Sequence, residues 1–226
     1  MTMNLNKSLE FFDPDQIKGP CHIIGCGAIG GCIAELLARQ GVKDIHLWDF
    51  DIVASHNIVN QIYTEEDINR PKVEALKKQL RKINSNIKVT THEQGWENNI
   101  INNYMFLCLD NIETRKKVLL YNKDNQQLKL VTDCRMTLTQ GQCYTAKWDN
   151  PIEKNSLLDS MNFTHEEAMA ETPVSACGFT LSVAPTVRII TSYAIANFMK
   201  YINNKEDKMF KKLIISDPFR AELTAV

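Results

Sequence analysis

A glycine-rich turn between two apolar runs is the feature that most constrains the fold of this 226-residue chain. Gly25, Gly27 and Gly30 form a G-x-G-x-x-G motif directly after the run CHII, and an amphipathic segment to Gln40 leads into a second run, DIHLWDFD. In this context the motif binds phosphate, because the backbone can approach the ligand closely and the helix N-terminus favours negative charge. We therefore predict a β-α-β unit with a nucleotide site at its first turn.

The remainder of the chain continues the alternation of strands and helices. Helical spacing of apolar residues predicts further helices at 70–84, 111–122 and 185–201, and a short one is considered at 96–103. Apolar or alternating runs predict further strands at 87–94, 104–110, 128–134, 141–149 and 211–217, the last of which we expect to be the final strand. These elements indicate an α/β fold, a Rossmann-like three-layer α/β/α arrangement. Its mixed, mainly parallel sheet is extended by antiparallel C-terminal strands, and right-handed crossovers join the parallel strands.

Composition and charge limit the organisation and the partners of the chain. The chain length favours a single domain over residues 1–226, with an N-terminal extension at 1–18. A long crossover-type loop is expected at 150–177, with one short helix around 165–171. Twenty-six basic and twenty-seven acidic residues leave a net charge of −1, so we expect neither nucleic acid nor a membrane as partner.

The seven cysteines indicate a reducing compartment. Their number is odd, most lie in apolar runs, and no two have C-x-x-C spacing, so we predict buried reduced thiols without a disulfide framework or a zinc site. No stretch approaches the roughly 18 apolar residues that span a bilayer, and the N-terminus lacks the apolar core of a signal peptide. We therefore expect a cytoplasmic protein.

Three separated motifs, in order, resemble the ThiF/MoeB/HesA family. They lie between Gly19 and Arg115 and read DFDIVASHNIVNQIY, NRPKVEALKKQLRKIN and FLCLDNIETR, and a looser similarity resumes at ACGFTLSVAPTVRIITSYAIANFMKYI. Members of this family are relatives of the ubiquitin-activating enzymes. The resemblance implies an ATP-dependent adenylyltransferase. Its substrate would be the C-terminal carboxylate of a ubiquitin-like protein, a sulfur-carrier protein or a peptide, and this carboxylate would attack the α-phosphate of ATP. Pyrophosphate is released and an acyl-adenylate is formed.

The resemblance also implies roles for individual residues. Those that would bind ATP are Gly25, Gly27, Gly30, Asp49, Asp51, Asn57, Gln61 and Lys72. Among them, Asp49 would accept hydrogen bonds from the ribose hydroxyls, and Lys72 would contact phosphate as a mobile point charge. Asp110 falls on the Mg²⁺-binding aspartate of the family, and a carboxylate at a strand tip is a hard oxygen ligand suited to Mg²⁺.

The sequence departs from the family at its cationic residues. Asn60 stands where the family has an arginine before Gln61, and the first arginine in the chain is Arg39, so an N-terminal arginine of many relatives has no counterpart. Removing phosphate-binding arginines lowers transition-state stabilisation, by analogy with arginine fingers. Arg70 and Arg135 are the candidate substitutes, and we place Arg135 with Lys72 and Asp110 in the catalytic set.

Several alternatives remain open at this stage. A catalytically weakened relative could bind nucleotide or serve as a scaffold for an active partner, and the missing arginines favour it. A nicotinamide-dependent oxidoreductase would fit the glycine turn and Asp49. Cys177 is either a covalent acceptor or an inert buried thiol. The helix at 185–201 is apolar on most faces, which predicts a subunit partner and hence a homodimer.

Overall fold

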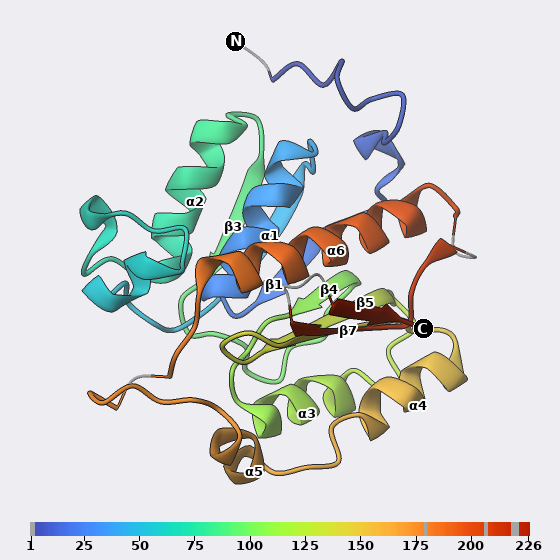
Figure 1. The fold of residues 1–226 in the computed structure, drawn as a ribbon. Helices are drawn as coiled ribbons and strands as arrows, with labels where there is room; N and C mark the ends of the chain where they lie inside the picture. Colours follow the sequence, from blue (N-terminus) through green and yellow to red (C-terminus); the bar gives the residue numbers. More distant parts are fainter. Residues whose placement is uncertain (1–2, 179, 206–207, 218–221) are drawn as a thin grey trace.

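The computed structural model describes residues 3–178, 180–205, 208–217 and 222–226. In this part of the chain, eight strands form one sheet in the order β3-β2-β1-β4-β5-β6-β7-β8 (Figure 1). The strands are β1 (Cys21–Ile24), β2 (Asp44–Trp48), β3 (Lys88–His92), β4 (Asn103–Leu107), β5 (Leu128–Met136), β6 (Gly141–Lys147), β7 (Lys212–Asp217) and β8 (Glu222–Ala225). Five neighbouring strands, β3, β2, β1, β4 and β5, pair in parallel, and β6, β7 and β8 are added antiparallel.

Helices cover both faces of this sheet, so the chain has the predicted three-layer α/β/α architecture (Figure 1). The helices are α1 (Ala28–Arg39), α2 (Lys72–Ile83), α3 (Ile112–Tyr121), α4 (Pro151–Asp159), α5 (His165–Ala170) and α6 (Ala184–Ile202). Short 3-10 turns lie at η1 (Pro14–Gln16), η2 (Ser55–Val59) and η3 (Glu65–Asp67). In the described residues, no helix combines the length and the apolar character that crossing a bilayer requires.

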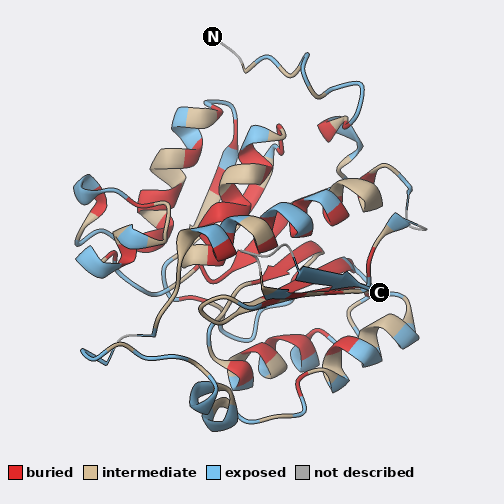
Figure 2. Ribbon diagram, viewed as in Figure 1, coloured by how far each residue is buried: buried red, intermediate tan, exposed pale blue. Residues whose placement is uncertain are grey.

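Two apolar cores hold the layers together, one on each face of the sheet. The first contains side chains of α1, α2 and α6, and the second contains side chains of α3 and α4. Successive residues of β1 alternate between them, since Ile23 belongs to the first core and Ile24 to the second, and both are fully buried. Figure 2 shows burial along the central strands and on the helix surfaces that face them. A strand buried on both faces reads as a continuous apolar run, which is why these strands were predictable.

The chain reverses its direction of travel across the sheet between β1 and β4. From β1 it moves outward through α1, β2, α2 and β3, and it then returns to place β4 on the other side of β1. In open α/β sheets the crevice at the carboxyl ends of two such strands is the usual place for a ligand. The glycine turn follows β1 and Asp110 follows β4, so the topology directs both to this crevice.

The segment 150–177 differs from its predicted form. We expected a loop with one short helix; α5 is that helix, but α4 precedes it and was missed. Asn150 caps α4 by accepting hydrogen bonds from the amides of Ile152 and Glu153, Pro151 occupies the first turn, and Glu153 accepts from the Lys147 amide. These are standard helix-start signals that were present in the sequence.

Two other expectations fail. Residues 96–103 form no helix, because Asn98 and Asn103 have φ of 53° and 57°, in the left-handed region, and the Ile101 amide bonds to the Asn122 side chain. β7 is also not the last strand, because β8 pairs with it antiparallel. The four residues of β8, ELTA, alternate between polar and apolar, but all four are exposed and the run is too short to stand out as a strand in the sequence.

Candidate functional site

The glycine turn between β1 and α1 leaves the start of the helix open. Gly25 has φ of +93°, and a Cβ at this position would lie 2.8 Å from the carbonyl oxygen of Cys108. A Cβ at Gly30 would lie 1.8 Å from the carbonyl oxygen of Gly25. Gly27 is the N-cap of α1 and has no side-chain cap, and no described atom lies within 4 Å of where its Cβ would be. The free amides of this helix start can therefore receive an anion.

Asp49 is fixed beside this turn by backbone amides. Its Oδ2 accepts a hydrogen bond from the Cys26 amide at 2.6 Å, and its Oδ1 accepts one from the Asp51 amide at 2.8 Å. Burial raises the pKa of this carboxyl, and the two amide bonds oppose that shift. Each oxygen keeps a further lone pair, so the carboxylate can still accept hydrogen bonds from a ligand.

Lys72, the first residue of α2, is buried and paired. Its Nζ lies 2.8 Å from Oδ2 of Asp51, and its backbone amide donates to the Asp51 carbonyl at 2.9 Å. The Tyr63 hydroxyl lies within hydrogen-bond distance of the carbonyl oxygens of Cys26 and Lys72, at 2.6 and 3.3 Å. The start of α2 is thus attached to the glycine turn, and the structure brings Lys72, Asp51, Asp49 and the turn together.

Asn57 and Gln61 belong to the loop around η2. Asn57 is buried, and its Oδ1 accepts from the Ala54 amide at 2.9 Å, so it orders the loop. The Gln61 amide donates to the Asn57 carbonyl at 2.9 Å, and its side-chain Oε1 is buried without a partner among the described residues. Asn60, which replaces the expected arginine, ends η2. The Asn60 side chain carries no cation to this loop.

Asp110 lies exposed at the tip that follows β4. The tip is anchored because the Cys108 amide donates to the Ile24 carbonyl at 2.8 Å, next to the glycine turn. Asn111 then caps α3 by accepting from the Thr114 amide at 2.9 Å. The Asp110 carboxylate has no partner among the described residues, so one hard oxygen donor is free at this edge of the sheet. Mg²⁺ is commonly bound by one or two carboxylates together with substrate phosphates, so this donor fits it.

The two candidate substitute cations differ in their surroundings. Arg70 is exposed, two residues before Lys72. Arg135 is held by its neighbours: its Nε lies 2.6 Å from Oδ2 of Asp133, and its Nη1 and Nη2 each lie 2.9 Å from oxygens of Ser160. Its guanidinium also lies 4.7 Å from the centre of the Tyr144 ring. Arg135 therefore has structural contacts, and its catalytic role stays a prediction.

Sequence reasoning missed two charged residues that lie under the site. Asp133 in β5 is fully buried and pairs with both Arg135 and Arg115 of α3. The signal was a carboxylate inside the apolar run LKLVTDC, since a charge within a buried strand requires a partner. Arg115 was part of the FLCLDNIETR motif, but no role was assigned to it.

Five of the seven cysteines follow the prediction of buried reduced thiols. All seven are free thiols; five are buried, Cys108 is partly exposed and Cys177 is exposed. The interpretation of Cys177 as a buried thiol is therefore wrong, because it lies on the open segment between α5 and α6. Its exposure alone does not make it reactive, so a covalent role stays a prediction.

Comparison with known proteins gives a consistent family. Residues 17–226 match the model described as ThiF family. A sulfur carrier protein ThiS adenylyltransferase of Bacillus subtilis is 44% identical over 71 residues, 30% of this chain and 21% of the relative. A molybdopterin-synthase adenylyltransferase of Haemophilus influenzae is 31% identical over 120 residues, 50% of this chain and 49% of the relative.

Among solved structures, MccB of E. coli crystallised with ATP superposes with a TM-score of 0.70 at 19% identity. This similarity covers 94% of the present chain and 65% of the MccB chain. At this level of identity it supports the fold alone. The aligned regions span half or less of the two sequence relatives and about two thirds of MccB.

Proposed function

The chain belongs to the ThiF family, and on this premise we propose that it is an ATP-dependent adenylyltransferase. Its acyl substrate would be the C-terminal carboxylate of a ubiquitin-like protein, a sulfur-carrier protein or a peptide. The observation that carries the proposal is the uncapped start of α1 at Gly27, where a Cβ would meet no described atom. This opening offers backbone amides to a phosphate group next to Asp49 and Lys72. The adenylyltransferase names of the two sequence relatives support the same assignment.

The reaction brings two anions together. The acyl carboxylate attacks the α-phosphorus of ATP, the bond to the bridging oxygen breaks, and pyrophosphate departs with the electron pair. Catalysis then depends on positioning and on neutralising the charge that accumulates on the leaving group. In this chain the amides at the start of α1 would hold the phosphates, Asp49 would orient the ribose, and Lys72 would supply positive charge after separating from Asp51.

We also propose Mg²⁺ as the metal, with Asp110 as its protein ligand. The free, exposed carboxylate at the β4 tip is the support for this assignment. When bound, the ion would neutralise part of the charge on the departing pyrophosphate. Asn57 and Gln61 would order the loop around η2, and the unpartnered Oε1 of Gln61 could accept a hydrogen bond there.

A nucleotide-binding scaffold is the second candidate function. Asn60 cannot supply the cation expected at its position, and Arg135 is engaged by Asp133 and Ser160. Among the described residues this leaves Arg70, exposed and close to Lys72 in sequence, as the substitute with the fewest constraints. A relative with too little positive charge would bind ATP without transferring its adenylyl group to a carboxylate. The oxidoreductase alternative receives no support from the relatives' names.

Pyrophosphate exchange tests the proposal directly. The chain would be incubated with ATP, Mg²⁺, labelled pyrophosphate and carrier proteins or peptides that end in Gly-Gly. Label entering ATP only when an acyl substrate is present would support the adenylyltransferase. ATP binding by calorimetry without exchange would favour the scaffold, and binding of NAD in preference to ATP and AMP would contradict both.

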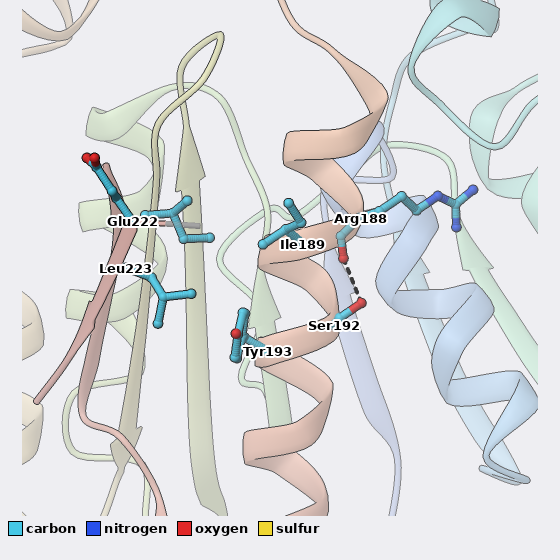
Figure 3. A pocket seen from close by; sticks show the side chains of 7 residues that line it. Arg188, Ile189, Ser192, Tyr193, Glu222 and Leu223 are labelled. Carbon is cyan, nitrogen blue, oxygen red and sulfur yellow. Dashed lines mark hydrogen bonds between the residues drawn. The ribbon is translucent and has the colours of Figure 1, made fainter. Parts of the chain in front are cut away.

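We further propose a cytoplasmic homodimer. The seven free thiols support a reducing compartment. An open groove of about 440 Å³ lies between α6 and the β7–β8 edge, lined by apolar side chains that include Ile189, Tyr193 and Leu223 (Figure 3). Arg188 points away from this groove toward α1, where it pairs with Glu35 at 2.7 Å. A second copy is the occupant we propose, because β8 also ends the sheet with an open edge.

Light scattering at micromolar concentration tests the homodimer. Tyr193→Lys should shift the mass toward the monomer, because the lysine would place a charge in the covered groove. Tyr121→Lys is the matched control, since Tyr121 is also exposed but lies at the end of α3, on the opposite face of the sheet. A monomeric unsubstituted protein, or equal effects of the two substitutions, would contradict the proposed interface.

A further inference from the structure

A buried charge cluster lies beneath the tip that carries Asp110. Asp133 is fully buried, and its two carboxylate oxygens pair with different arginines: Oδ1 with Arg115 and Oδ2 with Arg135. Arg115 is itself buried, at 5% exposure. Arg135 continues outward to Ser160, at the end of α4. The cluster therefore connects α3, β5 and α4 at the end of the sheet where the candidate site lies.

The guanidinium of Arg115 reaches three acceptors at once. Besides Asp133, its Nη1 donates to the carbonyl of Leu107 at 3.2 Å and its Nη2 donates to the carbonyl of Cys134 at 2.8 Å. The Arg115 amide also donates to the carbonyl of Asn111 at 3.1 Å. Leu107 precedes Asp110 by three residues, so the Arg115 side chain holds the strand end that leads into the tip. The bond to Asn111 is a main-chain bond of α3 and does not depend on the side chain.

This geometry needs the shape of arginine as well as its charge. A guanidinium is planar and presents five donors in fixed directions, whereas a lysine ammonium is a compact point charge. A buried ion pair adds little stability over apolar residues of similar volume, so stability alone gives a weak reason for this cluster. The contacts to Leu107 and Cys134 instead join the ends of β4 and β5, which fixes the backbone on which Asp110 is carried.

We propose that Arg115 is a positioning residue, which holds the Asp110 carboxylate where it meets Mg²⁺ and the nucleotide phosphates. The proposal rests on the proposed function, because it assigns Asp110 to the metal. Arg115 acts only through the backbone of the tip, with Asp133 as the buried counter-charge that keeps its guanidinium in place. Replacing Arg115 should therefore raise the Mg²⁺ concentration that nucleotide binding requires.

The test is a double-mutant cycle with calorimetry as its readout. The Mg²⁺ concentration that gives half-maximal ATP binding would be measured for the unsubstituted chain, Arg115→Lys, Asp110→Ala and the double variant. Arg115→Lys should raise this concentration about tenfold when Asp110 is present and leave it unchanged when Asp110 is alanine, because coupled residues are non-additive. Arg39→Lys is the matched control, since Arg39 makes only an exposed pair with Glu35, and it should have no effect.

Equal effects of Arg115→Lys in both Asp110 backgrounds, or a lower melting temperature with an unchanged Mg²⁺ requirement, would overturn the positioning role. If Arg115→Lys does not fold, Asp133→Asn serves as the second variant. It removes the counter-charge while keeping the side-chain shape, and it should give a smaller shift in the same direction, again only with Asp110 present.

Failure of the unsubstituted chain to bind ATP would refute the proposed function and this inference together. Normal binding with no shift in either variant would refute this inference alone.

Discussion

The ammonium of Lys72 lies 2.8 Å from the carboxylate of Asp51, and the lysine is 6% exposed while its partner is half exposed. The buried ammonium of Lys72 therefore has an anionic partner within the chain. A phosphate group can replace this partner because the side chain of Asp51 reaches solvent. We infer that nucleotide binding exchanges one anion for another at Lys72, which keeps the buried ammonium compensated in both states.

Removing the positive charge of Lys72 should impair catalysis. Lys72→Met keeps most of the apolar stem of the side chain and removes its charge. We expect pyrophosphate exchange to fall by a factor on the order of 10² to 10³, the range seen when one charge-stabilising group is removed. Lys78→Met, on the same helix and paired with Glu66 near the surface, is the control and should retain exchange. Equal activity of the two variants would remove Lys72 from the catalytic set.

The carboxylate of Asp110 should be required for metal-dependent chemistry and dispensable for folding. Because the side chain is exposed and unpartnered, Asp110→Ala should change the unfolding midpoint in urea by no more than surface substitutions usually do. Mg²⁺-dependent adenylate formation should be lost. Asp124→Ala, an equally exposed aspartate beyond α3, should retain the activity. Retained exchange in Asp110→Ala would contradict the metal assignment.

Much of this site could be predicted from local sequence. The glycine turn, Asp49 and Asp110 follow apolar runs long enough to be buried strands, and parallel topology then places their carboxyl ends at one edge. The ion pair between Lys72 and Asp51 could not be predicted in this way. The two residues are 21 positions apart, and their contact depends on how the loop between them folds back, which no periodicity records.

The parts that were missed have different physical causes. α4 was missed because its start signals at Asn150 and Pro151 were read as loop composition, although together they cap a helix. β8 was missed because an exposed edge strand carries no burial pattern. The contact between Arg115 and Asp133 is tertiary: the sequence indicated that Asp133 needed a partner, but several arginines could have supplied it.

Alanine at either of two glycines of the turn should weaken ATP binding, but only one of the two substitutions should also impair folding. Gly30→Ala would place a Cβ 1.8 Å from the Gly25 carbonyl oxygen, so the turn must distort, and we expect loss of both folding stability and ATP binding. A Cβ at Gly27 would meet no described atom, and the backbone there, with φ of −72° and ψ of −151°, is extended and not left-handed. Gly27→Ala should fold normally and bind ATP about tenfold more weakly, because the methyl group enters the space proposed for phosphate. Unchanged ATP affinity in Gly27→Ala would place the phosphates elsewhere.

Three neighbouring imidazoles on the first strands should make stability fall in mild acid. His22 accepts a hydrogen bond from Trp48 Nε1 at 3.2 Å, and the rings of His46 and His92 lie 3.2 Å apart at their nearest nitrogens. Burial, followed by the neighbouring His46, lowers the pKa of His22 to about 4, and burial also lowers the pKa values of His46 and His92. In the unfolded chain these groups titrate near 6.5, so between about pH 6.5 and 4 the unfolded state binds more protons.

The free energy of unfolding should therefore decrease as pH falls through this window. The stabilising contribution of the three neutral imidazoles should be complete above it. For His22, a pKa lowered to about 4 corresponds to a loss on the order of 3 kcal/mol at pH 4. Urea unfolding of His22→Gln should show a shallower decline between pH 6.5 and 4 than the unsubstituted chain, because carboxylates contribute equally to both. An identical slope in His22→Gln would mean that His22 takes up its proton over the same pH range in the folded and the unfolded chain, which would contradict the lowered pKa of His22.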